Sequence, residues 1–167
     1  MKKLFITLAL IAFIGSMSAQ NSLSWKQDGK RCSINLLTGD FSITCYDNAG
    51  NEFTVYGPNY DFEVNASSGY ISYNGSGKVC SVGNTYISYN GSGKVCSVGN
   101  TYISYNGSGK VWSVGNTYIS YNGSGKVWSV GSTYISYNGS GKVWSVGNAY
   151  ISYNGSGNVC SISGSVK

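Results

Sequence analysis

The sequence predicts an all-β protein in which tandem β-hairpins form one antiparallel meander, and three observations lead to this expectation. A sixteen-residue unit occurs six times without an insertion, with copies that start at Tyr70, Tyr86, Tyr102, Tyr118, Tyr134 and Tyr150. The chain holds 15 tyrosines, 24 glycines and one proline, and tyrosine favours strands while glycine favours tight turns. Each unit also divides into two short strand patterns separated by two turn signals.

The turn signals set the register that we expect within each unit. In the first unit, the Asn-Gly-Ser-Gly at 74–77 predicts a four-residue hairpin loop. A Gly-Asn pair near the end of the unit predicts a two-residue turn with positive φ at the glycine. Two five-residue strands remain, which places Tyr73 opposite Lys78 and Ile71 opposite Cys80. One face then carries Ile, Val, Tyr, Lys and the Cys-or-Trp position, and the other carries mostly Ser and Tyr.

A meander of six such hairpins has an apolar face too wide to stay flat, because each strand adds about 4.8 Å. We expect the sheet to curl into a barrel, fold over itself or spiral. The alternative is a β-solenoid with one sixteen-residue coil per repeat, since a fixed period suits it equally. The tight two-residue turn favours hairpins, because a solenoid arch needs more room.

Residues 1–19 have the pattern of a secretory signal peptide. Lys2 and Lys3 precede an apolar run over 4–14, and small residues lead to Ala19. This run is too short to cross a bilayer, which needs about 20 apolar residues, and no later segment is apolar enough. We therefore expect bacterial-type export with cleavage after Ala19, a secreted or cell-surface location and no membrane span.

Residues 20–69 are strand-like and precede the six repeats at 70–165 and a short tail at 166–167. We expect this N-terminal segment to continue the repeat sheet or to cap its first edge. A turn at Thr38 and Gly39 would place Cys32 directly opposite Cys45. Opposed cysteines on neighbouring strands lie within disulfide range, and export permits oxidation. Cys32 and Cys45 are therefore a candidate disulfide.

The stretch 73–79, Tyr-Asn-Gly-Ser-Gly-Lys-Val, resembles the YD repeat of Rhs-type secreted and surface proteins. The resemblance covers about seven residues of each unit; here Asn74 replaces the Asp of that repeat, Lys78 replaces its Arg, and the period is shorter. The earlier stretch at 46–51 keeps the Asp, as Asp47. The resemblance implies spiralling β-hairpins on an exported protein, and it implies no toxin or enzyme domain.

The composition argues against an enzyme. The repeat region contains no Asp, Glu, His or Arg, so it offers neither a carboxylate pair nor a histidine base. All six acidic residues precede it: Asp28, Asp40, Asp47, Glu52, Asp61 and Glu63. The chain has no histidine and no CxxC spacing, so we expect no metal site and no cofactor.

Two functions fit these patterns. The first is a secreted or cell-surface structural or adhesive protein. Its repeats carry no charge apart from lysines, which is compatible with self-association into an oligomer or fibre. The alternative is a binding module for carbohydrate or an anionic surface polymer, using a strip of Tyr, Trp and Lys. Specific nucleic-acid binding is not expected.

The candidate binding strip consists of three columns that recur with the repeat. Its members are Tyr73, Tyr89, Tyr105, Tyr121 and Tyr137; Lys78, Lys94, Lys110, Lys126 and Lys142; and Trp112, Trp128 and Trp144. The competing interpretation places the tryptophans in the core, because cysteine occupies the same position at Cys80, Cys96 and Cys160 and both residue types are commonly buried.

Overall fold

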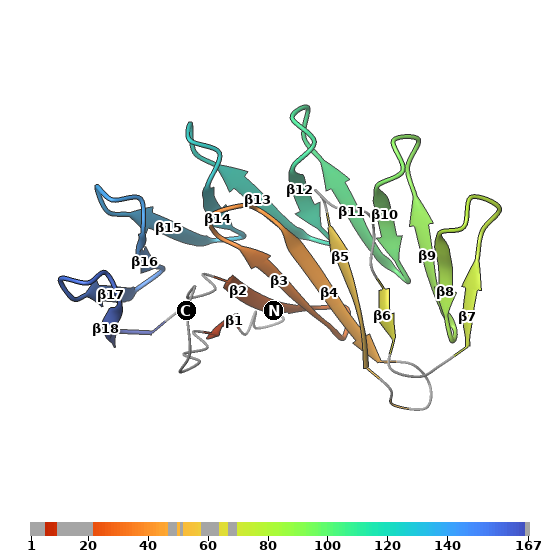
Figure 1. The fold of residues 1–167 in the computed structure, drawn as a ribbon, viewed down its shortest axis with the longest axis horizontal. Coiled ribbons are helices and arrows are strands. Elements are labelled where there is room, and N and C mark those ends of the chain that lie inside the picture. Colours follow the sequence, from red (N-terminus) through yellow and green to blue (C-terminus); the bar gives the residue numbers. More distant parts are fainter. Residues whose placement is uncertain are drawn as a thin grey trace.

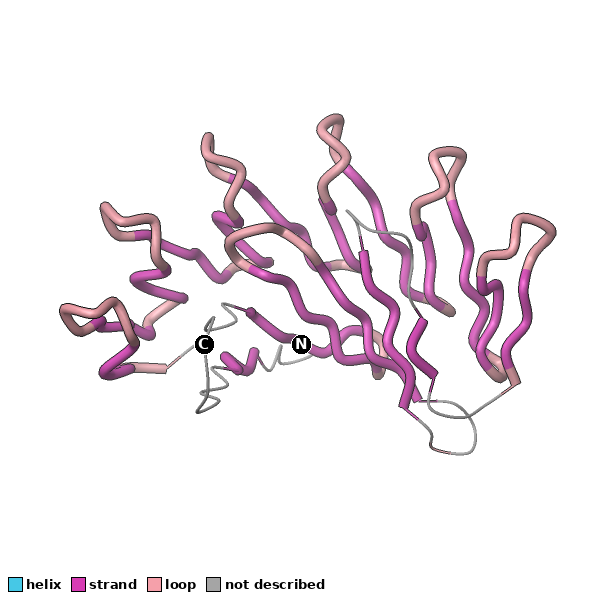
Figure 2. The backbone as a smooth tube through the Cα atoms, in the orientation of Figure 1, coloured by secondary structure: helices cyan, strands magenta, loops and turns pink. Residues whose placement is uncertain are grey.

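The computed structural model describes residues 6–9, 22–46, 50, 52–57, 64–66 and 70–165, and all regular structure in them is β (Figure 1, Figure 2). The strands form two antiparallel sheets, one of six strands in the order β1 to β6 and one of 12 strands in the order β7 to β18. Every neighbour in each sheet is also the neighbour in sequence. The predicted all-β hairpin meander is confirmed, and the solenoid alternative is wrong.

The six-stranded sheet lies in the N-terminal part of the chain. Its strands are β1 (Ile6–Ala9), β2 (Ser22–Gln27), β3 (Lys30–Asn35), β4 (Phe41–Tyr46), β5 (Glu52–Gly57) and β6 (Val64–Ala66). The repeat sheet contains β7 (Ile71–Tyr73), β8 (Val79–Val82), β9 (Thr85–Tyr89), β10 (Val95–Val98), β11 (Thr101–Tyr105), β12 (Val111–Val114), β13 (Thr117–Tyr121), β14 (Val127–Val130), β15 (Thr133–Tyr137), β16 (Val143–Val146), β17 (Ala149–Tyr153) and β18 (Val159–Ser163).

Each hairpin loop is closed by its asparagine, as the fourth repeat shows. The Asn122 amide donates to the Lys126 carbonyl at 2.9 Å, and the Asn122 side-chain oxygen accepts from the Ser124 and Lys126 amides, each at 3.0 Å. Gly125 takes a φ of 78°, which glycine adopts without a steric cost. The loop therefore runs over 122–126 and includes Lys126, whereas the predicted register places this lysine in a strand.

A β-bulge in every hairpin changes the register that we predicted. In the fourth repeat Tyr121 pairs with Val127 and Ser120 pairs with Ser129, so Trp128 is the extra residue. The predicted pairing of Tyr with Lys and of Ile with the Cys-or-Trp position is wrong. The cause is the spacing of Val127 and Val130, since valines three residues apart face the same side of a strand only across a bulge. Both are fully buried.

The two-residue turn between hairpins has the predicted form. In the fourth repeat Val130 pairs with Thr133, and the Gly131 amide donates to the Tyr118 carbonyl at 2.7 Å. Gly131 has a φ of 57°, and equivalent glycines in the other repeats have similar values. This positive φ at the first turn residue matches the twist of the strands that it joins.

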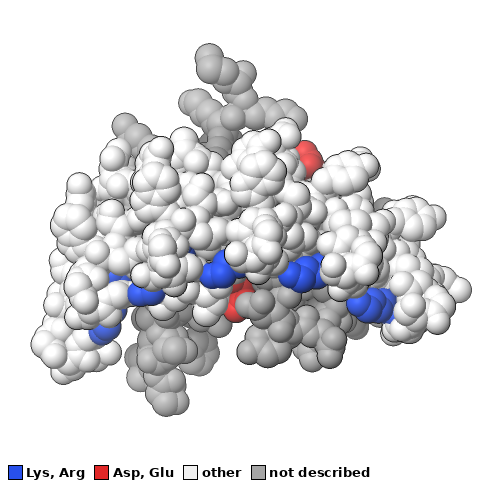
Figure 3. Space-filling model, turned by 90° about the horizontal axis from the view of Figure 1, so that it is seen from above, with Lys and Arg blue, Asp and Glu red and all other residues white. Residues whose placement is uncertain are grey.

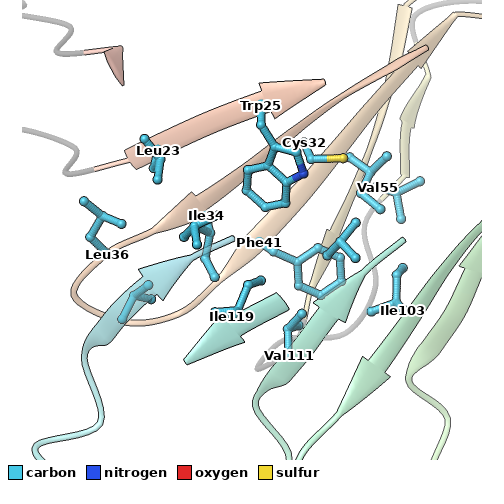
Figure 4. Packing of buried hydrophobic residues seen from close by; sticks show 14 of the residues in the cluster. Leu23, Trp25, Cys32, Ile34, Leu36, Phe41, Val55, Ile103, Val111 and Ile119 are labelled. Atoms are coloured by element: carbon cyan, nitrogen blue, oxygen red, sulfur yellow. The ribbon is translucent and has the colours of Figure 1, made fainter. Parts of the chain in front are cut away.

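The repeat sheet curls without closing, and the N-terminal sheet lies on its concave side (Figure 1). Leu23, Trp25 and Phe41 of the N-terminal sheet share one buried cluster with Val111 and Ile119 of the repeats (Figure 4). The prediction that residues 20–69 continue the repeat sheet is therefore wrong, because their strands form a separate sheet. The apolar concave face is covered by a second sheet, which removes it from water.

The hairpin turns of the N-terminal sheet attach it to the repeats. Leu36, after β3, accepts hydrogen bonds at its carbonyl from the Val127 amide at 2.9 Å and the Tyr137 hydroxyl at 2.7 Å. At the other turn, Lys30 donates to the Thr101 hydroxyl at 3.1 Å, and that hydroxyl donates to Asp28 at 3.2 Å. These contacts fix the position of the two sheets relative to each other.

Part of the predicted leader is described. Ile6–Ala9 forms β1, which pairs with β2 from Ile6 opposite Trp25 to Ala9 opposite Ser22; the rest of 1–19 lies outside the described residues. Among the residues that the structure describes, no helix has the length and hydropathy needed to cross a membrane.

Candidate binding surface

The convex face of the repeat sheet carries a regular set of exposed aromatic side chains. The first tyrosine of each repeat points outward, and its exposed fraction ranges from 47% at Tyr150 to 82% at Tyr70. The bulge directs the tryptophans to the same face, and about half of each side chain is exposed. We call this set the aromatic surface: Tyr70, Tyr86, Tyr102, Tyr118, Tyr134, Tyr150, Trp112, Trp128 and Trp144.

Each tryptophan packs against a tyrosine of the neighbouring strand. The ring centroids of Trp128 and Tyr134 are 5.1 Å apart with an interplanar angle of 66°. The pairs Trp112 with Tyr118 and Trp144 with Tyr150 repeat this edge-to-face geometry at 5.2 and 5.4 Å. Such contacts hold the rings in place while leaving about half of each indole open to solvent. The interpretation of the tryptophans as core residues is wrong.

The tyrosines of the predicted strip lie on the other side of the sheet. Tyr89, Tyr105, Tyr121, Tyr137 and Tyr153 are partly buried and pack against the core. The hydroxyl of each donates to the carbonyl of a valine in the preceding repeat, at 2.5 to 2.8 Å; the acceptors are Val79, Val95, Val111, Val127 and Val143. The single hydroxyl proton of Tyr137 is shared between the Val127 and Leu36 carbonyls. Tyr73, in the first repeat, is 63% exposed.

The lysines of the predicted strip bridge consecutive hairpin loops. Lys126 Nζ donates to the Gly141 carbonyl at 2.7 Å and lies 5.1 Å from the ring centroid of Tyr137. The lysines at 78, 94, 110 and 142 make the same two contacts with the next repeat. They form a line along the loop end of the sheet (Figure 3). The three columns of the predicted strip therefore do not lie together. The tryptophans lie on the convex face, and the tyrosines and lysines lie at the junctions between repeats.

Burial shifts the acidity of the junction tyrosines. It raises the pKa of Tyr105, Tyr121 and Tyr137 well above the usual value of 10. At Tyr89 burial also raises the pKa, with a smaller contribution from Cys80. The neutral phenol is favoured, so each hydroxyl keeps the proton that it donates.

Cys32 and Cys45 are buried in the N-terminal sheet and free. Cys32 pairs with Ile43 rather than with Cys45, so the predicted register is wrong by two residues. The length of the loop is the cause. Pairing Cys32 with Cys45 would place Leu36 opposite Phe41 and leave four residues between them, whereas Ile34 pairs with Phe41 and six residues lie between these partners. Burial, with a contribution from Cys45, raises the pKa of Cys32 to about 12, and burial raises that of Cys45 to about 11.

The cysteines of the repeats occupy the bulge position that tryptophan takes elsewhere. Cys80, Cys96 and Cys160 are free, and Cys160 is exposed. The exchange of Cys and Trp at this position, which favoured a core site in the sequence, instead reflects a bulge position where side chains of different size fit because the core is not filled there.

The described acidic residues lie on the surface of the N-terminal part. Arg31 is 3.7 Å from Glu52, whose carboxylate also accepts from Tyr46 at 2.9 Å, and both charged side chains are about half exposed. Within the described part of the chain, no three His, Cys, Asp or Glu side chains come together in a way that could hold a metal ion. Asp47, Asp61 and Glu63 lie outside the described residues.

Sequence reasoning missed the outer tyrosines of the aromatic surface. The predicted register places these tyrosines on the mostly Ser face, the less apolar face of the sheet. The spacing of the two valines in each repeat could have revealed the bulge, and the bulge would have placed tryptophan and the first tyrosine together.

No protein-family model, curated protein or solved structure matches this chain.

Proposed function

We propose that this protein is an exported adhesive repeat protein whose aromatic surface binds an extended carbohydrate polymer. The observation that carries the proposal is the row of half-exposed tryptophans, each held edge-to-face by a tyrosine. Monomeric soluble proteins rarely expose contiguous apolar surface of this kind unless it contacts a partner. Rigid aromatic rings stack on the apolar faces of sugar rings.

The repeat suits a polymer better than a small ligand. Equivalent rings lie two strands apart, which is about 9.6 Å along a flat sheet, close to the length of a disaccharide. A polymer can therefore contact several repeats at once, and the summed contacts give avidity that one site lacks.

The charges favour a neutral polymer over an anionic one. The charged side chains of the repeats are all lysines, and those at 78, 94, 110, 126 and 142 are partly buried and hydrogen-bonded to the next loop. An anionic polymer would have to compete with those contacts. Binding to acidic polysaccharide is the alternative that the experiment must distinguish.

Export and the YD resemblance are part of the same proposal. The leader pattern supports a secreted or cell-surface location, and the resemblance to YD repeats supports the same location. N-terminal sequencing of the protein recovered from the medium would test export, with Gln20 as the expected first residue.

The test of binding is sedimentation of the protein with insoluble neutral β-glucan and with chitin. A variant in which Trp112, Trp128 and Trp144 are all alanine should lose affinity by about tenfold or more. The matched control is Tyr56→Ala, which removes a 45% exposed aromatic ring from the N-terminal sheet and should bind normally. Unchanged binding of the triple variant would contradict the neutral-polymer proposal. Binding to the anionic polymer alginate alone, and only at low salt, would contradict it as well.

A further inference from the structure

Every junction between repeats uses the same reciprocal pair of contacts. The tyrosine of one repeat donates to a valine carbonyl of the repeat before it, as Tyr121 does to Val111 at 2.8 Å. The lysine of the earlier repeat donates to a glycine carbonyl in the next loop, as Lys126 does to Gly141. Five junctions in the described chain repeat both contacts.

The two ends of the repeat sheet carry the unmatched halves of this contact. Tyr73 in β7 has no repeat before it, and its side chain is 63% exposed. Val159 lies in β18, the last strand of the described sheet, and among the described residues its carbonyl has no tyrosine donor like those of the five preceding valines. One end therefore offers a donor and the other end an acceptor, in the arrangement that joins consecutive repeats internally.

Both ends are also strands with an open side. Within the described residues, the repeat sheet runs from β7 to β18 without closing, and each terminal strand is paired on one side only. Unpaired backbone groups on such a strand readily accept another strand. At β18 the side chains from Cys160 to Ser163 are exposed, and the two ends lie at opposite limits of the arc (Figure 1).

We propose that copies of this chain associate head to tail, with β18 of one copy pairing with β7 of the next. The Tyr73 hydroxyl of the second copy donates to the Val159 carbonyl of the first. The strand register follows the internal junctions, where Ser81 pairs with Tyr86, so Ser161 faces Tyr70 of the second copy. Such a heterologous contact generates a ring or a filament, depending on the rotation per copy.

One substitution weakens this junction and makes it reversible. Asn158 occupies the position where the five earlier repeats have lysine, so the first copy has no ammonium to donate to the Gly77 carbonyl of the second. Half of the reciprocal contact is missing at the interface between copies. The junction between two molecules is therefore weaker than the junctions within one chain. Asn158→Lys should restore the missing lysine contact.

The experiment is sedimentation velocity over a concentration series of the protein in its natural processed form. The weight-average mass should rise with concentration. Tyr73→Phe, which removes only the donor, should weaken association by roughly fivefold. Asn158→Lys should strengthen association by about tenfold or more. Ser156→Lys, at the exposed tip of the same loop, adds the same charge away from the junction and should leave association unchanged.

Two results would overturn the proposal. One is a concentration-independent monomer for both the natural protein and Asn158→Lys. The other is association that none of the variants changes, which would place the contact elsewhere, for example on the open edges of the N-terminal sheet. The readout does not involve carbohydrate, so it is independent of the aromatic surface.

Discussion

Lys126 Nζ donates a hydrogen bond of 2.7 Å to the carbonyl oxygen of Gly141, in the loop of the following hairpin. The same ammonium lies over the Tyr137 ring, and Tyr137 donates back to the carbonyl of Val127, next to Lys126. Neighbouring hairpins are thus joined by side chains as well as by the sheet. In repeat proteins such nearest-neighbour contacts largely determine stability.

Lys126→Met should destabilise the protein although it keeps the apolar stem of the side chain. The variant loses a charge-assisted hydrogen bond and a cation–π contact, both partly exposed, and we expect a loss of about 1–2 kcal/mol in the free energy of unfolding. Urea denaturation followed by tryptophan fluorescence measures it. Lys26→Met, at an exposed position of β2, is the control and should change stability by less than about 0.5 kcal/mol. Equal effects of the two variants would rule out a junction role for Lys126.

Tyr121→Phe should cost about 1 kcal/mol in unfolding free energy, because it removes only the hydroxyl that donates to Val111. The Val111 carbonyl would lose this donor in a partly buried site. Tyr118→Phe makes the same chemical change in the same strand, at a side chain that is 56% exposed, and should have little effect. Thermal and urea unfolding of the two variants side by side would show whether the junction hydroxyls contribute.

The hairpin repeat was predictable, and its register was not. The predicted unit has two five-residue strands, a four-residue loop and a two-residue turn. The observed unit has the five-residue strand Thr117–Tyr121, a five-residue loop, the four-residue strand Val127–Val130 and the same turn, so both fill sixteen residues. The period alone cannot distinguish the two. The buried valines decide between them, since only the bulge at Trp128 turns both Val127 and Val130 inward.

The position of the N-terminal sheet could not be read from its strand pattern. Alternation at Leu23 and Trp25 indicates one buried face. That face would be buried equally if these strands extended a curled repeat sheet or if they packed against its concave face. The choice depends on contacts between distant residues, such as the Leu36 carbonyl with the Val127 amide. The pattern left both an exposed strip and a core position open for the tryptophans, and the register decides between them, since the bulge at Trp128 directs the side chain away from the core.

The two faces of the repeat sheet should respond differently to truncation. Ile119 is fully buried between the sheets, so Ile119→Ala should cost about 2–5 kcal/mol. Trp128→Ala removes a larger side chain that is 49% exposed and packs edge-to-face on Tyr134, and it should cost only about 1 kcal/mol. Chemical denaturation of both variants checks the order. A larger loss for Trp128→Ala than for Ile119→Ala would return the tryptophans to the core and remove the basis for the aromatic surface.

Alkaline pH should lower the free energy of unfolding, because the buried thiols and phenols ionise more readily in the unfolded chain than in the folded one. Burial raises the pKa of Tyr105, Tyr121 and Tyr137 above 10, and that of Cys32 from 9.0 to about 12. A folded-state pKa above the unfolded value means that the stabilisation is complete below the unfolded pKa and is lost as pH rises toward the folded one. The free energy of unfolding should therefore be constant up to about pH 8 and then fall, with the thiols contributing from about pH 9 and the phenols from about pH 10.

Urea titrations at half-unit steps of pH, with tyrosinate absorbance recorded in parallel, measure both quantities. Tyr121→Phe should reduce the slope of stability against pH above pH 10, because one of the raised phenols is gone. Tyr118→Phe, which removes an exposed hydroxyl from the same strand, is measured beside it as the control variant. If stability stayed level to pH 11 while the tyrosines ionised, the buried hydroxyls would not be structural donors, and the reciprocal junction between repeats would have to be discarded.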